Sequence, residues 1–137
     1  MPGTDPAHWL RRLTPEEWLA AAETELALAA AALERRAVRP GVTHARRAAG
    51  MAWNAVLAAA PDDEALVARF GRSYMEHIEA LGTATDAPDE IRAAAALLLH
   101  TPPAPPALIT LGKPDLRALE AARAIVRHAA TSVKTDT

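Results

Sequence analysis

The chain has 137 residues, a length that predicts one compact domain. Its formal net charge of −2 and its sequence pI near 6.2 argue against a dedicated polyanion binder, which is usually a strongly basic domain, and leave room for local basic patches. It contains no cysteine, which excludes disulfides, thiolate zinc sites and cysteine nucleophiles. No apolar run approaches the roughly 20 residues that span a bilayer, and residues 1–6 lack a signal-peptide pattern, so we expect a cytoplasmic protein that does not enter a membrane.

The apolar content is dominated by small side chains. Of the 137 residues, 35 are alanine and 16 are leucine. Because apolar burial stabilises a fold by about 25 cal/mol per Å², a buried alanine contributes far less than a buried leucine. We therefore expect a homodimer whose partner supplies part of the core. Light scattering tests this expectation, and a strict monomer would remove it.

Three segments follow one another along the chain, and the second contains a connector. Residues 1–13 predict a short N-terminal segment that packs on the domain through Trp9 and Leu13. Residues 14–131 predict a single helical domain, and residues 132–137 a frayed tail. The proline-rich stretch 101–114 predicts an extended connector inside the domain.

The first full helix has a clear beginning. Thr14 is its expected N-cap, and Glu17, three residues later, completes a capping box. Apolar residues then repeat at helical spacing to about Ala37, and Pro40-Gly41 is expected to end the helix. Trp18 lies on the inward side of this helix, which favours a core position over a platform for stacking bases.

Two further helices follow. The second is expected from about Thr43 to Ala60, with Trp53 on its inward side, and Pro61 ends it. The third runs from there to about Leu81 and carries an apolar stripe of Val67, Phe70, Tyr74, Ile78 and Leu81.

The last two helices lie on either side of the connector. Pro88 opens the fourth, whose residues Ile91–Leu99 are apolar on nearly every side, as in the central helix of a bundle or at a dimer contact. If the protein only mediates assembly, changes at Leu97 or Leu98 should affect dimerisation most. The fifth helix starts at Pro114. No strand pattern occurs, so the predicted fold is all-α, an up-and-down bundle of four to five helices.

The first two helical patterns, EEWLAAAETEL at residues 16–26 and HARRAAGMAWNAVL at residues 44–57, together resemble the opening of a HEPN domain. The resemblance extends over residues 14–81. It implies a HEPN-like helical dimer that acts as a binding or accessory module for a nucleotide, for RNA or for a separately encoded partner protein. Fold kinship alone does not assign an activity.

The same resemblance identifies a candidate catalytic pair. Arg72 and His77 have the arginine, four residues, histidine spacing of HEPN nucleases, which cleave RNA without metal. Histidine would transfer protons and arginine would hold the phosphate. On one regular helix the two side chains would point about 140° apart, so they could converge only through a bend near Gly71 or across a dimer. The alternative interpretation is a solvated Arg72 and a His77 that flanks the core.

A second candidate site is basic. No acidic residue interrupts the stretch between Arg35 and Arg47, which also contains His44. Its arginines could bind phosphate or the RNA backbone next to a helix N-terminus. The alternative is a solvated turn whose first arginines interact with the negative end of the preceding helix. The candidates are Arg35, Arg36, Arg39, Arg46 and Arg47.

Metal and cofactor sites are not predicted. A di-iron bundle needs a glutamate three residues before a histidine on its helices. The positions three before His44, His77, His100 and His128 hold Gly41, Tyr74, Leu97 and Ile125. We therefore expect no metal and no cofactor.

Overall fold

The computed structural model describes residues 8–101 and 113–135, and all regular structure in these ranges is helical. The all-α prediction is therefore confirmed, with one more α-helix than the largest number expected. The elements are η1 (His8–Arg12), α1 (Pro15–Glu34), α2 (Val38–Ala58), α3 (Glu64–Phe70), α4 (Tyr74–Gly82), α5 (Asp89–His100) and α6 (Arg117–Thr135). Most of the predicted connector, residues 102–112, lies outside the described residues.

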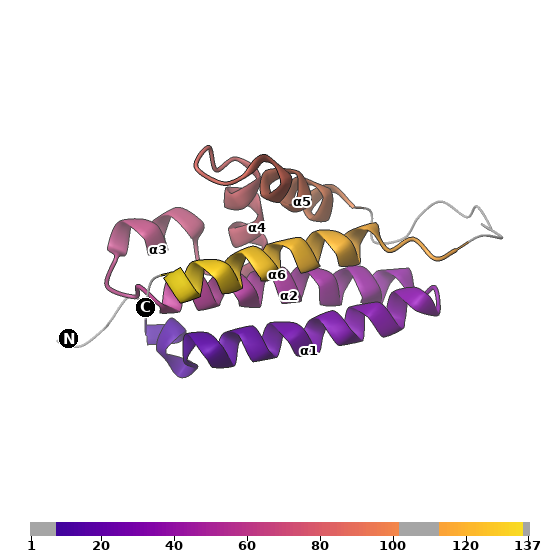
Figure 1. Ribbon diagram of the computed structural model, residues 1–137, viewed down its shortest axis with the longest axis horizontal. Helices are drawn as coiled ribbons and strands as arrows, with labels where there is room; N and C mark the ends of the chain where they lie inside the picture. The colour runs from indigo at the N-terminus through magenta and orange to yellow at the C-terminus, as the bar shows by residue number, and fades with distance from the viewer. Residues whose placement is uncertain (1–7, 102–112, 136–137) are drawn as a thin grey trace.

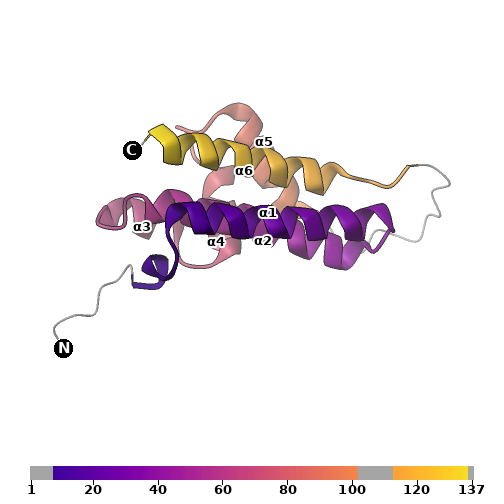
Figure 2. The ribbon, with the colours of Figure 1, turned by 60° about the horizontal axis from the view of Figure 1, so that its bottom comes forward.

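Three long helices, α1, α2 and α6, lie side by side, and the shorter α4 and α5 cover one side of this group (Figures 1 and 2). The chain runs out along α1 and returns along α2. Helix α2 packs against α1, α4 and α6, whereas α5 packs against α4 and α6. None of the described helices is both long and apolar enough to cross a bilayer.

Helix α2 is the central helix, whereas residues 91–99 were expected either in that position or at a dimer contact. Small residues let its neighbours approach closely, and Trp53, only 6% exposed, fills the remaining space. Its buried residues are Gly41, Val42, Ala45, Ala48, Ala49, Gly50, Ala52, Trp53, Asn54, Ala55, Val56 and Leu57. By contrast, α5 buries Ile91, Ala94, Ala95 and Leu98 within its own chain. Helix α5 therefore does not occupy the centre of the bundle, because half of its apolar residues between 91 and 99 are small alanines, and the expected dimer contact stays a prediction.

The start of α1 is as predicted, and its end is not. Thr14 and Glu17 form the expected capping box. The helix ends at Glu34, where Arg36 adopts a left-handed conformation with φ of 63° and the Ala37 N–H bonds the Ala32 carbonyl, as in a Schellman motif. Pro40 lies in the first turn of α2, where a missing N–H breaks no helical hydrogen bond.

The predicted third helix is two helices. Gly71 has φ of 73°, a conformation that side chains disfavour, and it separates α3 from α4. Ser73 then caps α4 through a capping box with Glu76. The signal was present in the sequence as serine followed three residues later by glutamate, but the apolar stripe continued across it.

The two ends of the described chain are more tightly packed than predicted. In η1, Leu10 is fully buried, and its carbonyl accepts a hydrogen bond of 3.1 Å from Trp18 Nε1. At the other end, α6 continues to Thr135, and Val133 is 4% exposed. The domain therefore extends beyond residue 131, because Val133 continues the apolar face of α6.

Candidate functional site

His77, the predicted catalytic histidine, has no exposed surface. Its Nδ1 lies 2.7 Å from the Phe70 carbonyl oxygen, and its Nε2 lies 2.6 Å from Asn54 Oδ1. Burial lowers the pKa of the ring below 6.5, the ordinary value. A neutral imidazole has one N–H, so Nδ1 donates to Phe70 while Nε2 accepts when the Asn54 amide turns its NH₂ towards it. Both nitrogens therefore have partners inside the fold.

Arg72 and His77 contact the same third side chain. The Arg72 guanidinium carbon lies 5.5 Å from the centre of the Trp9 indole, and the indole stacks on the His77 ring at 6.1 Å between centroids. A catalytic base must reach a substrate proton, and His77 is covered. The catalytic pair thus stays a prediction that requires Trp9 to move.

The five arginines of the basic stretch separate into two groups. Arg46 donates to the carbonyls of Leu98 at 2.9 Å and Thr101 at 2.7 Å, which satisfies the C-terminal end of α5. Arg47 pairs with the Glu25 carboxylate at 3.2 Å. The other three, Arg35, Arg36 and Arg39, are exposed around the turn between α1 and α2.

Glu25 was not singled out from the sequence, yet its charged side chain is buried, with 6% exposure. Its carboxylate contacts His44 Nδ1 at 2.6 Å as well as Arg47. Burial raises the pKa of the neighbouring Tyr74, an effect that Arg47 opposes and Glu25 reinforces. These groups join α1, α2 and α4. The available signal was the helical spacing of Glu25 from Ala22 and Ala29, both buried.

A cavity of about 330 Å³ opens among α1, α2, α5 and α6. Five of its nine described lining residues are aliphatic and four are polar. These residues are Leu33, Val38, Val42, Leu97, His100, Thr101, Asp115, Arg117 and Ala118. Pockets for small ligands usually have volumes of about 300–1,000 Å³, so this cavity suits a small molecule.

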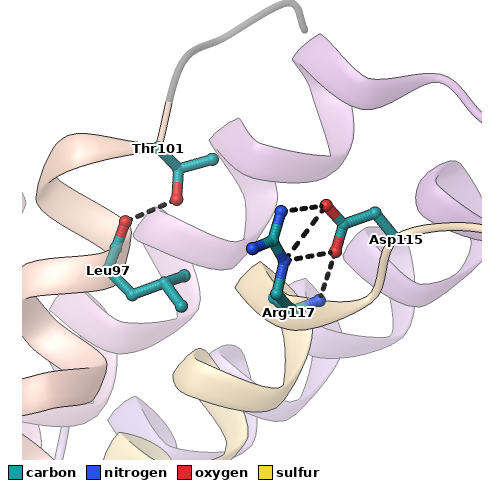
Figure 3. Close-up of polar contacts among 4 residues, drawn as sticks. All are labelled: Leu97, Thr101, Asp115 and Arg117. Carbon is teal, nitrogen blue, oxygen red and sulfur yellow. Dashed lines mark hydrogen bonds and ion pairs between the residues drawn. The ribbon is translucent and has the colours of Figure 1, made fainter. Parts of the chain in front are cut away.

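Three of the four polar lining residues, Thr101, Asp115 and Arg117, are already paired (Figure 3). The Thr101 hydroxyl donates to the Leu97 carbonyl, and Arg117 pairs with Asp115 at 2.8 Å. This hydrogen bonding lowers the pKa of Asp115 and raises that of Arg117. The Arg117 side chain is 79% exposed, so the ion pair contributes little to stability. Its guanidinium can therefore exchange Asp115 for a ligand.

Positive charge gathers at this end of the bundle, where α1 ends and α2 and α6 begin (Figure 1). Segments 34–39 and 113–117 contain five basic and two acidic residues, a local charge of +3 in a chain of net charge −2. No side chain caps the N-terminus of α2. The positive end of that helix dipole adds to the attraction for anions.

Comparison of the chain with protein-family models, curated proteins and solved structures gave no significant match. The HEPN resemblance therefore stays a prediction. Within residues 8–101 and 113–135, no three histidine, aspartate or glutamate side chains are grouped so that they could hold a metal ion.

Proposed function

We propose that this protein is a HEPN-like helical binding module that holds the phosphate groups of RNA or of a nucleotide at the turn between α1 and α2. One observation carries the proposal: Arg35, Arg36 and Arg39 are exposed around one turn. Exposed guanidinium groups bind phosphate oxygens in bidentate fashion. Arg46 and Arg47 are assigned a structural role instead, because Arg46 bonds the C-terminal end of α5 and Arg47 pairs with the buried Glu25.

The test is RNA binding by a triple variant, Arg35→Ala, Arg36→Gly and Arg39→Ala. Glycine at position 36 suits the left-handed backbone there, where φ is 63°, so this change should not destabilise the turn. We expect affinity for a short single-stranded RNA to fall by about tenfold or more. Losing three phosphate contacts should also reduce the slope of log K against log salt by about 2.

The matched control replaces Arg123 and Arg127 with alanine. Both are exposed on α6, away from the turn, so their loss should leave the affinity nearly unchanged. Fluorescence anisotropy at several salt concentrations gives both the affinity for RNA and its dependence on salt. The proposal fails if the triple variant binds as the parent does, or if the control pair loses as much affinity.

A metal-independent endoribonuclease is the alternative. It is favoured by the contact of one indole, Trp9, with both Arg72 and His77. It requires Trp9 to leave and predicts RNA cleavage in EDTA. Arg72→Ala is the sharper variant, because Arg72 is exposed and its loss should leave the fold intact. Absence of cleavage by the parent protein would remove this alternative.

The proposal includes a homodimer, whose interface is not assigned. Leu28 and Met75 are the exposed large apolar side chains among the described residues, at 45% and 38%. Light scattering of the full chain tests the dimer, and a strict monomer would remove it.

A further inference from the structure

The cavity at the basic end has a lining that selects against a nucleobase. A base carries donors and acceptors on its edges, and leaving them unpaired in an apolar site costs about 1–3 kcal/mol each. The aliphatic side chains of the lining have no donor or acceptor, and of the four polar lining residues Thr101, Asp115 and Arg117 are already paired within the fold. None of its described lining residues is Phe, Tyr or Trp, the side chains on which bases usually stack.

An aliphatic chain fits the same lining without this penalty. Leu33, Val38, Val42 and Leu97 present branched apolar side chains to the cavity. Transfer of each methylene from water into such surroundings is favourable. The volume of about 330 Å³ lies at the lower limit for ligand pockets, which suits a short or medium chain.

The polar side of the cavity adds a preference for an anionic head group. Arg117 lines the cavity, and its exposed pair with Asp115 is weak enough to be exchanged. The surrounding segments carry a net charge of +3. A carboxylate matches the planar guanidinium fork of Arg117, whereas an ammonium head would be repelled by Arg117 and would have to displace it from Asp115.

The geometry points to a second binding site in this protein: the cavity takes the hydrocarbon chain of a medium-chain monocarboxylate, and Arg117 holds the carboxylate. This site goes beyond the phosphate site proposed at the turn between α1 and α2. The two share one end of the bundle and use different arginines, so each can fail alone.

The test is calorimetric titration of the full chain with butanoate, hexanoate, octanoate and decanoate. We expect saturable binding with one site per chain, and affinity that rises about three- to fourfold per added methylene until the cavity is full. Octanol should bind more weakly than octanoate, and octylamine more weakly still. Affinity independent of chain length, or equal for the acid and the amine, would overturn the proposal.

Matched variants locate the site. Leu97→Phe enlarges a half-buried residue in the cavity wall and should lower octanoate affinity about tenfold or more. Leu66→Phe makes the same change at a half-buried position in α3, outside the described lining, and should not alter the affinity for octanoate. Arg117→Gln should weaken octanoate binding about tenfold and leave octanol binding unchanged. Thermal unfolding confirms that each variant is folded.

The two proposals are separated by measuring RNA and octanoate binding with the same proteins. The arginine triple variant should lose RNA affinity and keep octanoate affinity, whereas Leu97→Phe should do the reverse. Equal octanoate affinity of the parent and Leu97→Phe would overturn the cavity proposal while leaving the phosphate site standing. Loss of RNA binding in the triple variant alone would support the phosphate site irrespective of the cavity.

Discussion

Replacing His77 with alanine is expected to lower the free energy of unfolding by about 3–5 kcal/mol. The ring has no exposed surface, so its removal leaves a cavity beneath Trp9. It also leaves the Phe70 carbonyl and the Asn54 amide without their partner. Urea unfolding followed by tryptophan fluorescence measures the change.

The control for this prediction is His100→Ala. His100 is exposed at the end of α5, and its replacement should change stability by less than about 0.5 kcal/mol. A loss below about 1 kcal/mol for His77→Ala would show that the imidazole is not buried in solution. The nuclease alternative would then gain support, because the ring could reach a substrate.

The same side chain predicts how stability depends on pH. Burial lowers the pKa of His77 in the folded state below 6.5, so the unfolded chain binds the proton more tightly. The contribution of His77 is therefore complete above about pH 6.5 and decreases as pH falls, at up to about 1.4 kcal/mol per pH unit. As pH falls below 6.5, the stability of His77→Ala should decrease less steeply than that of the parent protein. Equal slopes would contradict this assignment.

Gly50→Ala is expected to lower the free energy of unfolding by about 2–3 kcal/mol. A methyl group at Gly50 would lie 2.3 Å from Tyr74 Cβ and 2.4 Å from its Cγ. The Cβ atom is fixed to the backbone of α4, so α4 itself has to move away from α2. This cost exceeds the gain of up to about 1 kcal/mol from a better helix former.

Gly82→Ala is the matched control, because it makes the same change in α4 where space is available. Its new methyl group would meet Ala96 N at 3.9 Å and Ala95 Cβ at 4.0 Å, which are ordinary contacts. We expect unchanged or slightly higher stability, by up to about 0.5–1 kcal/mol. If both variants had the same stability, α4 would not pack closely on α2.

Several local features follow directly from the sequence. The capping box of Thr14 and Glu17 was identified correctly, because its partners lie three residues apart and need nothing from the rest of the chain. Trp18 and Trp53 were placed in the core, and both are buried. The all-α class followed from helical spacing of apolar residues. The sequence suggested a bend near Gly71 but not the end of a helix there, because an apolar stripe on consecutive helices looks continuous.

Which polar residues are buried, and which groups they bond, was decided only by the tertiary fold. Glu25 and His44 are 19 residues apart and meet across α1 and α2, and Arg46 reaches the end of α5, 52 residues away. Nothing in the local pattern distinguishes Arg46 from Arg39, although the fold binds the first and exposes the second. His77 is likewise covered by Trp9 and bonded to Asn54, and both contacts join residues that are distant in sequence. Local hydrogen bonds and helical spacing depend on neighbours in sequence, whereas burial of a charge depends on which distant helices pack around it.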